Sequence, residues 1–150
     1  MILWMLIGGS PGSTAGGMKT TTVAVLLLTT FAVFSRKDEA ECFGRRISTD
    51  VVRNATAILV MYFVLFFVGA ITISRIESLP LLTCLFETAS AIGTVGLTLG
   101  ITSGLGRVSR VILIALMFMG RVGGLTLIYA AHSARKPDYN KFPLEKIAVG

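Results

Sequence analysis

The sequence contains few charged residues and few of the residue types that carry enzyme chemistry. Charged residues make up 15% of the 150 residues, against roughly 25% in an average soluble domain. The two cysteines, Cys42 and Cys84, have no CxxC spacing, and His132 is the sole histidine. These residues offer neither a metal-ligand cluster nor a nucleophile paired with a base. An enzyme is therefore the least favoured class of function, and no cofactor is expected.

Basic residues outnumber acidic ones, 14 to 8, and most of them gather in two places. One group surrounds a polar loop and the other lies in the C-terminal tail: Arg36, Lys37, Arg45, Arg46 and Arg53, then Arg135, Lys136, Lys141 and Lys146. The positive-inside rule places both groups on the cytoplasmic side of a membrane. The cations form no stripe on a soluble face, so nucleic acid is not an expected partner.

Hydrophobic residues make up 53% of the chain and cluster in blocks. About 20 apolar residues cross a bilayer as a helix, so the sequence predicts an all-α integral membrane protein. Two short apolar blocks, 1–7 and 20–34, flank a glycine-rich segment at 8–17. Together they predict one broken transmembrane helix, with irregular backbone lining a water-filled cavity. A surface loop between two short helices is the less favoured alternative, because the segment has almost no charge.

The rest of the chain predicts one span–re-entrant pore helix–span unit of a potassium-channel-like pore. A polar cytoplasmic linker at 36–50 precedes it, and a cytoplasmic tail at 137–150 follows. The unit itself, residues 51–136, divides into a span at 51–74, a pore helix at 81–92, a filter at 93–98 and a span at 108–132. The pore helix is too short to cross a bilayer but long enough to re-enter one.

The filter segment reads Gly93-Thr94-Val95-Gly96-Leu97-Thr98. Thr-Val-Gly is the core of the potassium-channel filter, where backbone carbonyls replace the hydration shell of the ion. Gly96 permits backbone conformations that other residues resist. The predicted ligands are Thr94, Val95, Gly96 and Leu97, with K⁺ (Na⁺ is the alternative) at the first three. Leu97 and Thr98 differ from the Tyr and Gly of channels, which favours looser selectivity.

Two charged residues in apolar segments are candidates for further roles. Glu87, with Gly93, is expected to support the filter through neighbouring backbone or hydroxyl groups; the alternative is exposure in an outer vestibule. Arg121 lies near the middle of the last span and is expected to reach the carbonyls of the glycine segment beneath the filter, forming a gate. Lys19 is expected to snorkel. The gate glycines are Gly8, Gly9, Gly12, Gly16 and Gly17.

Three segments in the same order, 8–21, 86–98 and 119–126, resemble the Trk/Ktr/HKT superfamily of potassium transporters. Residues 142–150 look like the end of the Ktr-type membrane subunit. The resemblance implies that 1–35 is the second half of a preceding repeat's inner helix, with the intramembrane gating loop, and that three other pore repeats complete the transporter. It also implies a dimer of membrane subunits, a cytosolic ring of nucleotide-binding regulatory subunits, and a multi-pass protein of the plasma (inner) membrane with a cytoplasmic C-terminus.

The expected function is therefore transmembrane transport of potassium, with this chain as the C-terminal part of an uptake subunit. Two alternatives stay open. Four copies of the pore-forming unit could assemble into a cation channel, or the chain could be a non-conducting membrane assembly or regulatory partner.

Overall fold

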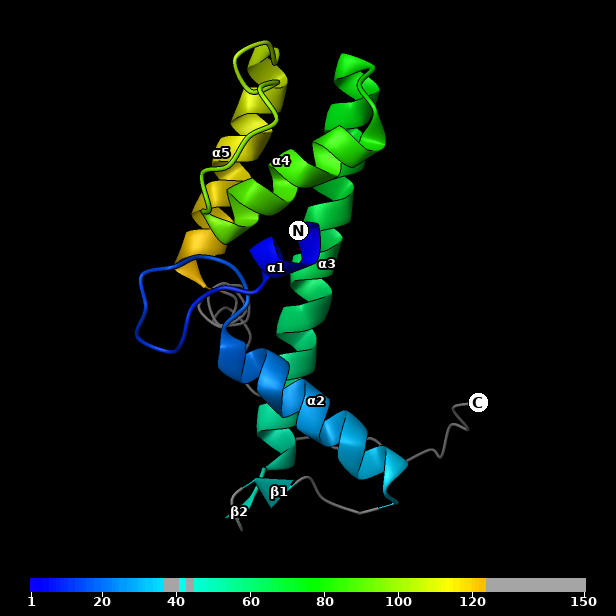
Figure 1. Cartoon of the computed structure of the whole chain (residues 1–150), viewed down its shortest axis with the longest axis vertical. Helices are drawn as coiled ribbons and strands as arrows, with labels where there is room; N and C mark the ends of the chain where they lie inside the picture. Colours follow the sequence, from blue (N-terminus) through cyan, green and yellow to red (C-terminus); the bar gives the residue numbers. More distant parts are fainter. Residues whose placement is uncertain (37–40, 43–44, 124–150) are drawn as a thin grey trace, which may run out of the picture.

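The computed structural model describes residues 1–36, 41–42 and 45–123. These form a mostly helical structure in which a short oblique helix crosses between two long ones (Figure 1). The elements in chain order are α1 (Ile2–Leu6), α2 (Thr20–Phe34), β1 (Glu41–Cys42), β2 (Arg45–Arg46), α3 (Thr49–Glu77), α4 (Leu81–Gly93) and α5 (Arg107–Val122). The end of the span predicted at 108–132 and the tail at 137–150 lie outside the described residues.

The longest helix is α3, with 29 residues and a length of about 43 Å. By length and composition it could cross a membrane, and it is the one helix in the described part of the chain that meets this criterion. Its bounds extend beyond the predicted span of 51–74 at both ends. Asp50 lies in its first turn, where a negative charge stabilises the helix by interacting with the positive end of its dipole. Ser78, with a left-handed φ of +53°, ends it.

The two apolar blocks form the helices α1 and α2, and α2 has the bounds of the apolar block 20–34. That they belong to one broken transmembrane helix stays a prediction. Two backbone hydrogen bonds hold the two ends of the glycine segment next to each other. The amide of Gly8 donates to the carbonyl of Met18 at 2.7 Å, and the amide of Met18 donates to Leu6 at 3.0 Å. The intervening residues form a loop beside the C-terminal ends of α4 and α5 (Figure 1). We call residues 8–17 the glycine loop.

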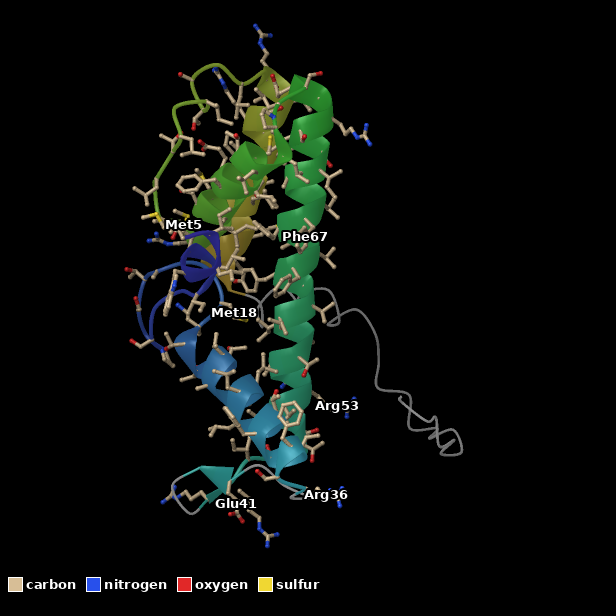
Figure 2. The ribbon with its side chains drawn as sticks, turned by 45° about the vertical axis from the view of Figure 1, so that its right-hand side comes forward. Met5, Met18, Arg36, Glu41, Arg53 and Phe67 are labelled. Atoms are coloured by element: carbon tan, nitrogen blue, oxygen red, sulfur yellow. The ribbon has the colours of Figure 1, made fainter. Side chains whose placement is uncertain are left out.

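The linker contains a minimal antiparallel hairpin, which the all-α prediction did not include. Its two strands pair Glu41 with Arg46 and Cys42 with Arg45. Figure 2 shows that Arg36, Glu41 and Arg53 lie together at the end of α3 that is farther from α4. Charged side chains are thus gathered at one end of the long helix.

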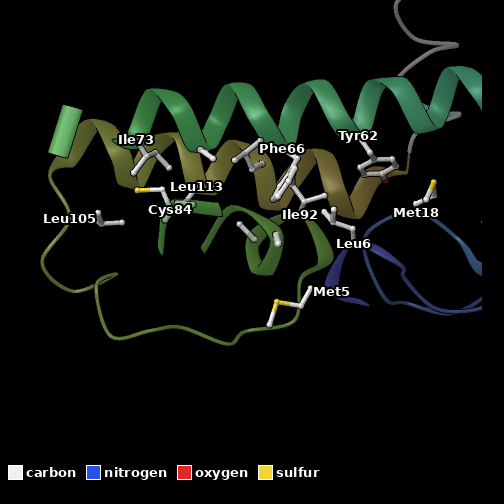
Figure 3. Close-up of a cluster of buried hydrophobic side chains, with 14 of the residues drawn as sticks. Met5, Leu6, Met18, Tyr62, Phe66, Ile73, Cys84, Ile92, Leu105 and Leu113 are labelled. Carbon is white, nitrogen blue, oxygen red and sulfur yellow. The ribbon is translucent and has the colours of Figure 1, made fainter. Parts of the chain in front are cut away.

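The core is formed where α4 packs between α3, α5 and α1. The buried face of α4 carries mostly small side chains, which allow the helices to approach closely: Cys84, Thr88, Ala89, Ser90 and Ala91. Larger side chains fill the remaining space, among them Phe66, Ile73, Ile92 and Leu113 (Figure 3). The oblique position of α4 is therefore set by close packing on several sides.

A carboxylate joins the ends of α3 and α5. Oε1 of Glu77, the last residue of α3, accepts hydrogen bonds from the amide of Gly106 at 2.8 Å and from the hydroxyl of Ser109 at 2.6 Å. Ser109 is fully buried. Glu77 thereby satisfies the N-cap amide of α5, which has no partner within the helix, and the hydroxyl of Ser109. This contact positions the start of α5 relative to the end of α3.

Candidate functional site

The predicted filter begins where α4 ends. The amides of Thr94 and Val95 donate to the carbonyls of Ala91 and Ser90 at 3.1 and 3.0 Å, which closes the last turn of the helix. Thr94 and Gly96 have positive φ, +51° and +79°, whereas Val95 and Leu97 do not. The positive φ of Thr94 belongs to the C-cap of α4, and that of Gly96 turns the backbone again two residues later. The segment therefore departs from an extended strand directly after α4, next to the negative end of a helix dipole.

One side of this segment is covered and the other is open. Gly93 is buried against α1, and a Cβ built on it would lie 2.1 Å from the carbonyl oxygen of Met5. Val95 and Leu97 are 44% and 45% exposed. Gly93 is thus packed by its backbone in a way that excludes a side chain, and its support of the filter stays a prediction. The open side leaves room for other protein segments to complete a site.

Glu87 lies behind the filter and is only 4% exposed. Its Oε1 accepts hydrogen bonds from the hydroxyl of Thr98 at 2.5 Å and the amide of Leu99 at 2.9 Å, and its Oε2 accepts one from the hydroxyl of Thr102 at 2.9 Å. The exposed vestibule position considered as the alternative is wrong for this side chain. The carboxylate instead joins α4 to the segment that follows Leu97, and Thr98 and Thr102 are partners that sequence reasoning did not identify.

The glycine loop contacts both the filter and α5. The amide of Gly16 donates to Oγ1 of Thr94 at 3.0 Å, and the amide of Gly17 donates to the carbonyl of Gly120 at 3.2 Å. Gly17 has a φ of +78°, and Gly8 approaches Gly16 so closely that a Cβ on Gly8 would lie 2.1 Å from its carbonyl oxygen. Of the other predicted gate glycines, Gly9 packs on Ser13, and Gly12, with φ +89°, has open space around it.

The cation that binds the glycine loop is Lys19, not Arg121. Nζ of Lys19 donates to the carbonyls of Ser13 and Ala15 at 3.0 and 2.9 Å. Arg121 is exposed, and within the described residues no hydrogen bond joins its guanidinium to the loop. The predicted contact of Arg121 is thus not present there. The neighbouring residue Gly120 makes the contact from α5 through its backbone. A gating role for Arg121 stays a prediction.

Replacing Lys19 by methionine is expected to loosen the glycine loop, because two carbonyls lose a charged donor. Hydrogen bonds to charged groups are stronger than neutral ones, so amide exchange of residues 10–17 should rise about ten-fold. Hydrogen–deuterium exchange of the chain in detergent micelles measures this. Arg121→Met is the matched control and should leave loop exchange unchanged. Equal effects of the two substitutions would contradict the assignment of Lys19.

The described residues include no group of three or more His, Cys, Asp or Glu side chains that could hold a metal ion. At the predicted filter, residues 93–98, the oxygens available to a cation are backbone carbonyls and threonine hydroxyls. Such neutral ligands suit the transient binding of a monovalent ion, since binding must be weak enough to allow release.

Comparison with known proteins identifies similar sequences. Residues 1–140 match the family model TrkH, described as a cation transport protein. The chain is 40% identical over 152 aligned residues to the Potassium/sodium uptake protein NtpJ of Enterococcus hirae, covering 97% of this chain and 34% of that protein. It is 39% identical over 129 residues to the Ktr system potassium uptake protein B of Bacillus subtilis, covering 86% of this chain and 29% of the relative. The chain thus spans about a third of the length of these relatives.

Proposed function

This chain belongs to the TrkH family of cation transport proteins, and on that premise we propose that it supplies one of four pore repeats of a potassium uptake subunit. The observation that carries the proposal is that the segment Thr94–Leu97, with positive φ at Thr94 and Gly96, directly follows the C-terminal end of α4. In a filter of this kind, backbone carbonyls replace the water around a monovalent cation. The ligands are the filter residues Thr94, Val95, Gly96 and Leu97.

The proposed mechanism divides binding, support and gating among neighbouring elements. The filter residues bind the dehydrated cation, while Glu87 and Gly93 hold the segment on its covered side. The glycine loop, docked against Thr94 and Gly120, obstructs the path below the filter until it moves. The uncovered side of the filter supports a role for three further repeats, because one segment cannot surround an ion. K⁺ is the proposed ion, with Na⁺ as the alternative.

The proposed setting is a multi-pass subunit in the plasma (inner) membrane with its C-terminus in the cytoplasm. The cluster of charged residues around the α2–α3 linker supports a cytoplasmic position for that end of α3 (Figure 2). Proposed partners are the remainder of the transporter, a second membrane subunit and a cytosolic ring of nucleotide-binding regulatory subunits. The relatives named after the Ktr system support a system of several components.

A chimera tests the proposal. The chain replaces the segment that it matches in NtpJ of Enterococcus hirae, and the chimeric subunit is produced in a bacterial host that lacks its own potassium uptake. We expect growth and ⁸⁶Rb⁺ uptake at low external K⁺, and none from the chain alone. A chimera that reaches the membrane but transports no cation would refute the function. Uptake by the chain alone would favour a self-assembling channel.

Gly96→Ala in the chimera is expected to reduce uptake about ten-fold, because strain of about 1–2 kcal/mol at a positive φ disturbs the carbonyls that bind the ion. Gly100→Ala is a close control. Gly100 has a φ of +87° against +79° for Gly96, and a Cβ at either position has nothing within 4 Å. The two substitutions thus introduce similar strain, and only one lies in the filter. Equal losses of uptake would argue against the filter assignment.

A further inference from the structure

Thr94 stands where the filter and the glycine loop meet. Its Oγ1 accepts the hydrogen bond from the amide of Gly16 at 3.0 Å, across 78 residues of chain. The contact is tight as well as polar, since a Cβ built on Gly16 would lie 2.7 Å from both Cγ2 and Oγ1 of Thr94. The first filter residue therefore uses its side chain to hold the loop in its docked position.

The same hydroxyl oxygen is a suitable ligand for a cation at the lower end of the filter. An amide N–H presents the positive end of its dipole to that oxygen, so a docked loop opposes a cation at the same place. Coupling between two ligands is reciprocal, so that each weakens the binding of the other by the same factor. Loop docking and cation binding are thus linked through one atom.

The glycine loop has hydrogen bonds of its own that do not involve this oxygen. Lys19 binds two carbonyls within the loop, and the amide of Ser13 donates to the carbonyl of Ser10 at 3.0 Å. The bonds of Gly8 and Met18 close its ends. Only the bonds of Gly16 to Thr94 and of Gly17 to Gly120 connect the loop outward to the filter and to α5, among the bonds that involve described residues. Few hydrogen bonds would therefore have to break for the loop to move away from the filter and α5 as a unit.

We propose that Oγ1 of Thr94 is a shared ligand, bound by Gly16 when the glycine loop is docked and by the permeating cation when the loop is released. This inference rests on the function proposed above. It makes Thr94 a residue that couples ion occupancy to the gate. Binding of the cation at this oxygen would also favour release of the glycine loop.

Hydrogen–deuterium exchange of the purified chimera tests the coupling, in KCl and in N-methylglucamine chloride at equal ionic strength. K⁺ should accelerate exchange of the segment that contains Gly16 about five-fold, the change in an equilibrium constant that one neutral hydrogen bond typically carries. Thr94→Ser keeps the oxygen and should keep the response. Thr94→Val removes it, so exchange should be fast in both salts. Thr56→Val, at an exposed position of α3, is the control for the loss of a hydroxyl and should behave as the parent.

Uptake by the chimera tests the coupling a second time, because two substitutions should shift its K⁺ dependence in opposite directions. Gly16→Ala should displace the loop while leaving the hydroxyl of Thr94 in place, so the K⁺ concentration for half-maximal uptake should fall about five-fold. Thr94→Val should raise it. A chimera that transports K⁺ but whose exchange at Gly16 does not respond to K⁺ refutes the coupling and leaves the proposed function standing. If Gly16→Ala does not fold, the comparison of Thr94→Ser with Thr94→Val still decides.

Discussion

Gly120→Ala is expected to abolish uptake by the chimeric subunit and to destabilise the packing of α5 on α4. A Cβ at this position would lie 2.0 Å from the carbonyl oxygen of Ile92, 2.9 Å from its carbonyl carbon and 3.0 Å from its Cα. These atoms belong to the backbone of the last turn of α4 and cannot rotate away. Overpacking typically costs about 1–3 kcal/mol and occasionally more, and a clash with fixed backbone lies at the upper end; it would shift the helix end from which the filter starts.

The effect should extend to the glycine loop, because the carbonyl of Gly120 accepts the hydrogen bond of Gly17. We expect uptake to fall more than about 100-fold, and the thermal midpoint of the chimera in detergent to decrease. Gly69→Ala is a graded control. Its Cβ would lie 2.8 Å from Cδ1 of Leu116, the end of a flexible side chain that can turn aside. Gly104→Ala, with a nearest atom at 3.6 Å, should be silent. Parent-like uptake and stability for Gly120→Ala would contradict the close contact of α4 and α5.

The helices could be predicted from the sequence because each follows from a local signal. An apolar block bounded by polar residues predicts α2, and the long run of Val, Ile and Phe predicts α3. Pro80 and the glycine at the end of a short apolar run indicate where α4 begins and ends. The hairpin in the linker was not predicted, since two-residue strands leave no period to detect.

The contacts of the site could not be predicted in the same way, because they depend on the path of the glycine loop. That path turns at positive-φ glycines, and it brings Ser13 and Ala15 to Lys19 instead of to Arg121. The sequence alone does not indicate which of the two cations, Lys19 or Arg121, binds the loop. The one available signal for Lys19 is its position at the end of the loop, within a few residues of the carbonyls that it binds.

The hydroxyls that bind Glu87 are a similar case. A carboxylate in an apolar helix predicts that some donors must satisfy it, but not which ones. Thr98 and Thr102 follow the filter in the chain, and only the return of this segment over α4 brings them to Oε1 and Oε2. Sequence reasoning therefore identified the residue that needed partners and missed the partners themselves.

Glu87→Met is expected to reduce uptake by the chimera about 100-fold. The thioether has a similar length but cannot replace the carboxylate as an acceptor. The hydroxyls of Thr98 and Thr102 can rotate toward other partners, whereas the amide of Leu99 has a fixed direction and would lose its acceptor. A donor left unsatisfied in this partly buried contact costs up to about 1–3 kcal/mol, and the upper end of that range corresponds to that change in rate. Uptake of ⁸⁶Rb⁺ and its competition by Na⁺ measure the effect.

Glu87→Gln separates the loss of hydrogen bonds from the loss of charge. The amide oxygen can still accept from Leu99 and Thr98, and its NH₂ group can donate to the hydroxyl of Thr102, so the support is largely kept. Uptake should then fall less than about ten-fold. Asp50→Asn removes a negative charge at an exposed position of α3 and should have no effect. If Glu87 acted chiefly by attracting cations, glutamine and methionine would be equally harmful. A graded series therefore assigns Glu87 to holding the filter backbone, and equal losses would assign it to the electrostatic field of the pore.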